Sequence, residues 1–224
     1  MPAPTRYPAI RPIETLSRVT VGVLALAAVP FGIEVISSVS WLAVSRGLHG
    51  DLANLGETEA RVLDGLDAVA VFGGALTWLA AAVVFIVWLF RARGNVDAFD
   101  RYIQRWGRPW LFFGWIVPFA NLVIPRRIIG DLWIGGNPGD ENARRHGSTP
   151  LIDWWWGFFL FSWFMSMVYG KLEPQNAGDF DQQAYVGVID GAVGVIAAVL
   201  AARIVLGIDR GLREQAAGLA SQPG

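Results

Sequence analysis

Carboxylates within or beside apolar segments are the residues of this chain best placed to do chemistry. Glu34 lies about 15 residues into the first apolar segment, roughly 22 Å along a helix. Asp190 lies a little over one turn into the last such segment, and Asp64 and Asp67 precede the second. Ionisable groups at membrane depth are rare and usually face a bundle interior or water. Together these carboxylates predict an outward-facing polar vestibule that binds a cation or a proton.

A structural interpretation of the same carboxylates stays open. A protonated Glu34 would form a hydrogen bond within a helix bundle, while Asp67 and Asp190 would lie at headgroup level. A transport site usually carries polar residues through the full membrane thickness, and the inner half of these segments is poor in them.

Other chemistry has little support in the sequence. The 224 residues include no Cys, which excludes disulfides, thiolate metal sites and thiol nucleophiles, and the two His residues lie far apart. No serine lies in a Gly-x-Ser-x-Gly motif, and the polar loop 135–150 lacks the Gly-Lys-Ser/Thr ending of a phosphate-binding loop. We therefore expect no enzyme, metal site, cofactor or nucleic-acid partner.

The elements that position these residues are apolar segments long enough to cross a bilayer. The chain is 54% apolar, with 11 Trp and 13 Phe, and about 20 apolar residues span a membrane. The first segment is too long for the apolar region of a cleaved signal peptide. The predicted fold is an all-α integral membrane bundle of four transmembrane helices, at 19–44, 68–90, 152–169 and 185–206.

The basic residues predict the orientation, because Arg and Lys prefer the cytoplasmic side of short loops. If both termini are cytoplasmic and 109–125 does not cross, only Arg46, Arg61 and Lys171 lie outside, against 15 of the 18 basic residues inside. A full crossing would remove this bias. The prediction is a multi-pass protein of the bacterial plasma membrane, with cytoplasmic tails 1–18 and 210–224 around one transmembrane domain, 19–209.

The stretch "GWIVPFANLVIPRR" at 114–127 is therefore predicted to enter and return as a re-entrant or interfacial hairpin within 109–134. Pro118 removes a backbone donor and disfavours helix before it, and the Asn121 side chain is expected to satisfy freed backbone groups. Irregular backbone at membrane depth must be covered by protein or face water. A full span with a proline kink is the alternative.

The segment before this hairpin is predicted to be an amphipathic interfacial helix over 94–107, with apolar residues at helical spacing. Basic residues near the membrane surface attract anionic lipids at about 1 kcal/mol each. The candidate contacts with anionic lipids of the inner leaflet are Arg91, Arg93, Arg101, Arg105, Arg126 and Arg127. The alternative is a basic connector that only fixes the topology.

Small residues mark the last span. Gly187 and Gly191 form a Gly-x-x-x-Gly pair, which allows close helix approach and favours packing within the bundle over a dimer seam. Trp154 to Trp156 open the third span as an interfacial aromatic belt would, although an aromatic cage for a substrate remains an alternative.

Two stretches carry a resemblance to a known family: "WLFRARGNVDAF", with Arg91, Arg93 and Asn95, and "GWIVPFANLVIPRRIIGDLW". The second contains the most specific spacing, Trp115, Pro118, Asn121 and Pro125, followed by Asp131 and Trp133. The chain resembles the bacterial, largely actinobacterial, membrane family catalogued as domain of unknown function 4328. The resemblance implies membrane topology and no particular reaction.

The leading functional hypothesis is an interaction protein, acting as a scaffold, sensor or accessory subunit with a membrane or cytoplasmic protein partner. This hypothesis has two grounds. The sequence shows no set of catalytic residues, and its predicted cytoplasmic face is rich in Arg and aromatic residues. The alternative is a small transporter or channel component that uses Glu34 and Asp190. A third hypothesis, a lipid-modifying enzyme near Trp154 to Trp156, has no nucleophile or metal ligands to support it.

Overall fold

The structure of the protein is a computed structural model, which describes residues 10–47, 55–99, 103–172 and 177–221. Within these ranges the chain forms helices and turns and no strand. Four helical segments are long and apolar enough to cross a membrane, at Glu14–Gly47, Glu57–Phe99, Pro150–Tyr169 and Gly178–Leu219. The predicted all-helical fold with four candidate membrane-spanning helices is thus confirmed.

The long helices extend beyond the apolar segments that predicted them. Helix α1 runs over Glu14–Gly47 and begins on an acidic residue, which suits the positive end of the helix dipole. The second span combines α2 (Glu57–Ala68), the π-helix η2 (Val69–Gly73) and α3 (Gly74–Phe99). Helices α7 and α8 cover Pro150–Tyr169 and Ala177–Ala220.

The region between α3 and α7 consists of short helices. These are α4 (Trp110–Phe113), the 3-10 turn η4 (Ala120–Leu122), α5 (Ile124–Gly136) and α6 (Glu141–His146). The chain breaks after Pro118, where Phe119 takes a φ of 62°, a conformation that costs energy for a residue with a Cβ. Helix α5 has 13 residues, about 20 Å at the helical rise, so no continuous helix long enough to cross a bilayer forms here.

The chain divides into two compact units. The first unit comprises Met1–Gly22, Ala82–Trp154 and Leu200–Gly224, and the second comprises Val23–Ala81 and Trp155–Val199. Helices α1, α3, α7 and α8 each contribute to both units.

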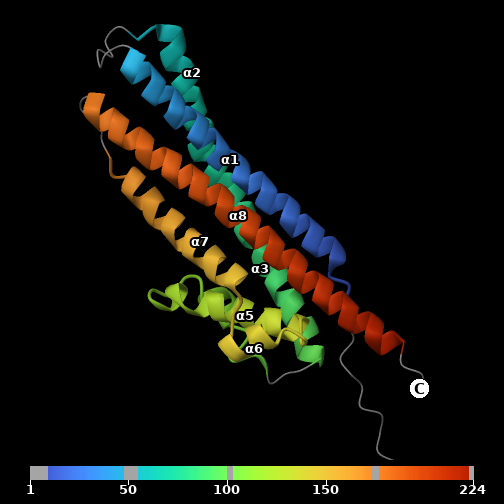
Figure 1. The fold of residues 1–224 in the computed structure, drawn as a ribbon. Helices are drawn as coiled ribbons and strands as arrows, with labels where there is room; N and C mark the ends of the chain where they lie inside the picture. The colour runs from blue at the N-terminus through green and yellow to red at the C-terminus, as the bar shows by residue number, and fades with distance from the viewer. Residues whose placement is uncertain (1–9, 48–54, 100–102, 173–176, 222–224) are drawn as a thin grey trace, which may run out of the picture. The chain divides into compact units, whose positions relative to one another are not determined.

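In the second unit, glycines of α8 lie directly against α1. A Cβ added at Gly191 would stand 2.5 Å from the carbonyl oxygen of Phe31, and one at Gly194 would stand 2.4 Å from the Phe31 ring. At Gly187 the neighbour is the Ser38 hydroxyl. The predicted close approach within the bundle is therefore present. In this unit α7 also runs beside α8 (Figure 1), joined to it by hydrogen bonds described below.

In the first unit, the glycine-ended helix α5 is held between α3 and α8. A Cβ at Gly135 would stand 2.3 Å from Val96 of α3, and one at Gly136 would stand 3.3 Å from the Ile208 carbonyl oxygen of α8. Gln215 of α8 donates hydrogen bonds to the carbonyl oxygens of Gly135 and Gly136, at 2.8 and 2.7 Å. Carbonyls at a helix C-terminus lack partners within the helix, so Gln215 caps α5 from another element.

The predicted interfacial helix over 94–107 is not confirmed. Residues 94–99 continue α3, residues 103–107 are not α-helical, and residues 100–102 lie outside the described part of the chain. Val96, one of the apolar residues at helical spacing within 94–107, is fully buried. The reason is tertiary, since its side chain packs on Gly135 of α5 in the first unit.

Candidate functional site

Asp67 is the first member of a polar group in the second unit. It lies at the end of α2, two residues before the π-helix η2. Its carboxylate accepts a hydrogen bond from the Ser37 hydroxyl and one from the Trp41 indole N–H at 2.9 Å, both on α1. Single π turns in helices are frequent near functional sites.

Asp190 is the second member and is 2% exposed. Its two carboxylate oxygens accept hydrogen bonds from α7, from Ser162 Oγ at 2.9 Å and from Ser166 Oγ at 2.6 Å. Two hydroxyl donors offset much of the cost of burying a carboxyl group. Asp190 thereby ties α8 to α7.

Glu34 of α1 lies within electrostatic reach of both Asp190 and Asp67. Its carboxyl group is half-buried and, among the described residues, forms no hydrogen bond. The Tyr169 hydroxyl at the end of α7 is within reach of all three carboxylates. We call Glu34, Asp67, Asp190 and Tyr169 the acidic cluster, one residue from each of α1, α2, α7 and α8.

The sequence predicted three of these residues to be neighbours, and the structure brings them together. Asp64, also expected in the vestibule, is exposed and takes no part in the interactions of the cluster. Tyr169 and the hydroxyl partners Ser37, Ser162 and Ser166 were missed. The spacing of Ser162 and Ser166 by four residues, facing an acid on the next helix, was the available signal.

The acidic cluster has the chemistry of a proton site more than of a metal site. Among the described residues, no three His, Asp or Glu side chains lie close enough to hold one metal ion. Asp67 and Asp190 already have hydroxyl or indole donors, whereas Glu34 has none and faces two like charges. A carboxyl group without a hydrogen-bond partner has no such bond to break when its protonation changes.

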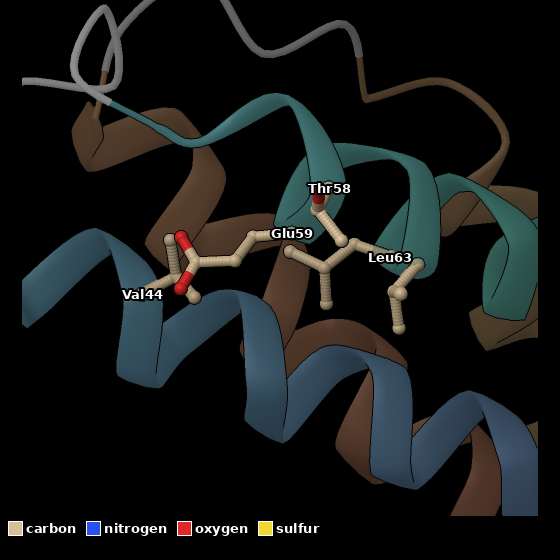
Figure 2. A pocket seen from close by; sticks show the side chains of 5 residues that line it. Val44, Thr58, Glu59 and Leu63 are labelled. Atoms are coloured by element: carbon tan, nitrogen blue, oxygen red, sulfur yellow. The ribbon is translucent and has the colours of Figure 1, made fainter.

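A hollow of about 230 Å³ lies between α1 and α2 in the same unit. Val44, Thr58, Glu59, Val62 and Leu63 line it, and Figure 2 shows the Glu59 side chain reaching along α1 to Val44. Its lining includes no member of the acidic cluster.

Three of the arginines predicted to contact lipid form ion pairs within the first unit. Arg93 is 7% exposed and pairs with Asp97 at 2.8 Å. Arg105 pairs with the buried Asp131 at 2.6 Å. Arg126 pairs with Asp153 at 2.6 Å.

The remaining basic candidates differ from one another. Arg91 donates to the Pro12 carbonyl at 3.0 Å, while the Asn95 amide exchanges two hydrogen bonds with the backbone of Arg11. Arg127 is exposed and has no ion pair within the described ranges. Arg101 lies outside the described residues. The Arg-x-Arg-x-Asn motif therefore fixes the chain just before α1.

The hairpin motif residues also have identifiable places in the first unit. Trp115 packs edge-on against Phe85 of α3, with ring centroids 5.8 Å apart. Pro118 precedes the turn, and Pro125 is buried in the first turn of α5. The Asn121 side chain makes no hydrogen bond within the described chain, contrary to expectation; its backbone N–H donates to Val117 at 3.0 Å.

Asp140 links the end of α5 to the start of α6 through hydrogen bonds to its side chain. Its carboxylate accepts hydrogen bonds from the Ala143 backbone N–H at 2.9 Å and from the Trp133 indole at 3.0 Å. These bonds, the Ala143 N–H foremost, hold the pKa of Asp140 below its ordinary value. Asp140 is thus the N-cap of α6.

The tryptophans at the start of α7 do not share one environment. Trp154 is 66% exposed, whereas Trp155 and Trp156 are buried. In the second unit Trp156 stacks on Phe159, with centroids 5.3 Å apart.

Comparison with known proteins identifies a family and no activity. Residues 51–210 match the family described as Domain of unknown function (DUF4328). No curated protein matches the chain, and no solved structure does either.

Proposed function

Because the chain belongs to the family described as Domain of unknown function (DUF4328), we propose its function from its own geometry. It is a four-span protein of the bacterial plasma membrane, with both termini cytoplasmic. It acts by interaction, as a scaffold, sensor or accessory subunit, and has no enzymatic activity of its own.

The observation that carries this proposal is the use of charge in the first unit. Arg93, Arg105 and Arg126 are each neutralised by an aspartate of the same unit. These ion pairs fix the geometry of the unit, and a fixed surface loses little conformational entropy when a partner binds. Helix α6 is one polar surface that the unit leaves exposed, with Asn142, Arg144 and His146 among its exposed residues, and such a face suits docking.

The topology rests on the bias of 15 basic residues against three and can be tested by labelling. The chain has no Cys, so single cysteines report one position each. Thr58→Cys, Asn142→Cys and Ser221→Cys all replace exposed residues. An impermeant thiol reagent on intact cells should label Thr58→Cys alone. Labelling of Asn142→Cys or Ser221→Cys would contradict the proposed orientation.

The interaction role can be tested with a photo-crosslinking amino acid at Asn142, with the same substitution at Thr58 as control. We expect one discrete cross-linked product from Asn142 in cells and none of the same mass from Thr58. Purified protein that by itself moved a solute or ion across a vesicle membrane would overturn the interaction proposal.

A second candidate function is favoured by the acidic cluster. Glu34 has no hydrogen-bond partner among the described residues and lies in reach of Asp67 and Asp190. This arrangement suits a proton- or cation-coupled transporter or channel component. Vesicles containing the protein would then show a flux that Glu34→Gln removes.

A further inference from the structure

We propose that residues 110–123, here called the apolar hairpin, insert into the cytoplasmic leaflet of the bilayer with lipid acyl chains as their partner. The proposal deepens the proposed topology and rests on it. Figure 1 shows this segment as the yellow-green loop that leads into α5.

The first observation is the exposure of the hairpin's apolar side chains. Phe119 at the turn is 85% exposed, and the exposed group also includes Phe112, Phe113, Ile116, Leu122 and Val123. Contiguous apolar patches are uncommon on surfaces that face water and usually mark a membrane or a partner. Leu111, Gly114 and Ile124 at the base are buried, so only the outer part of the hairpin is left uncovered.

The second observation is that almost all N–H groups of the hairpin donate to carbonyls within or just before the hairpin. From Trp110 to Val123, each N–H except that of Phe119 donates to a backbone carbonyl within 107–120; Pro118 has none to donate. A loop in water does not need these internal hydrogen bonds, because its backbone N–H groups can donate to water. In hydrocarbon an unsatisfied amide costs several kcal/mol. The pattern therefore favours lipid over solvent as the surroundings of the hairpin.

The depth of insertion is limited by the shorter of the two sides of the hairpin, which runs from Phe119 to Val123. Between Phe119 and Val123 the chain can advance only roughly 10 Å, at about 2 Å per residue of tight helix. An inserted segment of that reach occupies the boundary between headgroups and acyl chains of one leaflet. Arg127 follows at the base, exposed, while its neighbour Arg126 is held by Asp153. An exposed guanidinium at that level complements lipid phosphate.

The experiment places one fluorophore at the turn. Phe119→Cys and, as a second variant, Phe113→Cys are labelled with an environment-sensitive dye and reconstituted in nanodiscs that contain lipids spin-labelled on the acyl chain. Asn142→Cys on α6 is the matched control. We expect blue-shifted emission and quenching several times stronger at both hairpin positions than at Asn142→Cys.

Two outcomes would overturn the proposal. Emission typical of water at both hairpin positions would place the hairpin in solvent. Shielded emission without quenching by labelled lipid would mean that protein, either a partner or a second copy, covers it. The labelling experiment on intact cells tests the topology separately. If Thr58→Cys is labelled and Ser221→Cys is not, the topology stands, and either outcome above counts against the insertion of the hairpin alone.

Discussion

Asp131 of α5 receives three hydrogen bonds from one residue, Arg105. The Arg105 backbone N–H donates at 3.1 Å to one carboxylate oxygen, and its Nε and Nη2 donate at 2.9 and 2.6 Å to the other. Asp131 is 2% exposed, whereas Arg105 is half exposed. The pair therefore anchors the chain before the apolar hairpin to the buried side of α5.

Asp131→Ala should destabilise the protein by about 1–3 kcal/mol, because it removes a buried acceptor of charged donors. Water can reach the half-exposed guanidinium, which keeps the cost below that of a fully buried pair. Chemical denaturation in detergent measures the change.

The matched control for this pair is Arg145→Ala. Arg145 forms an ion pair with Glu141 in which both side chains are more than 70% exposed, and such pairs are worth about 0–1 kcal/mol. If the two variants were equally stable, Asp131 would not be an anchor of the first unit.

The sequence sufficed for the features that depend on local apolarity. Four segments of sufficient length predicted four helices, and Pro118 predicted the break that the structure has at Phe119. The small residues Gly187 and Gly191 predicted close packing, and they meet Ser38 and Phe31 of α1. In each case the physical cause lies in a few neighbouring residues.

Features that depend on contacts between distant parts of the chain could not be predicted from the sequence. Arg105 and Arg126 meet their aspartates 26 and 27 residues away, and no local pattern indicates such a pairing. Because the sequence does not reveal these partners, both arginines looked like unpaired charges, and lipid contacts were predicted for them. Tyr169 joins Glu34 only because α7 and α1 have a particular register, which a single sequence does not reveal.

Gly191→Ala should destabilise the second unit by about 1–3 kcal/mol, the usual cost of overpacking. The new methyl group would stand 2.5 Å from the Phe31 carbonyl oxygen and 2.7 Å from Val35, and a backbone atom cannot move aside cheaply. Gly32→Ala on α1 is the control, since nothing lies within 4 Å of its added Cβ. It should be neutral or stabilising, as Ala favours helix over Gly. Thermal unfolding that ranked the two variants in the opposite order would contradict this packing.

Asp140 should make the region around α6 sensitive to acid. Its pKa is lowered in the fold, chiefly by the Ala143 N–H, so its stabilising effect is complete above the ordinary aspartate pKa. That effect is lost as the pH falls through the lowered value. Asp140→Asn keeps a capping oxygen but carries no charge. The variant should therefore be less stable than the wild type at pH 7, with a smaller difference at about pH 3. A difference independent of pH would show that the charge of Asp140 plays no role.

Glu34→Gln should leave the protein as stable as the wild type or slightly more so. The Glu34 carboxyl group has no hydrogen bond to lose within the described chain, and a glutamine carries no charge that Asp67 and Asp190 could repel. Asp190→Ala should instead cost about 1–3 kcal/mol, because it leaves the Ser162 hydroxyl without its acceptor in a buried position. Unfolding curves of the two variants test this contrast.

Comparison of Glu34→Gln with the wild type decides between the two candidate functions. In vesicles with an internal pH-sensitive dye and an imposed potential, a proton-coupled protein would acidify the lumen, and folded Glu34→Gln would not. An interaction protein would give equal, background acidification with both chains. Because Glu34→Gln is expected to stay folded, a loss of flux in this variant would be a loss of proton transfer at Glu34 and would move the assignment from interaction to transport.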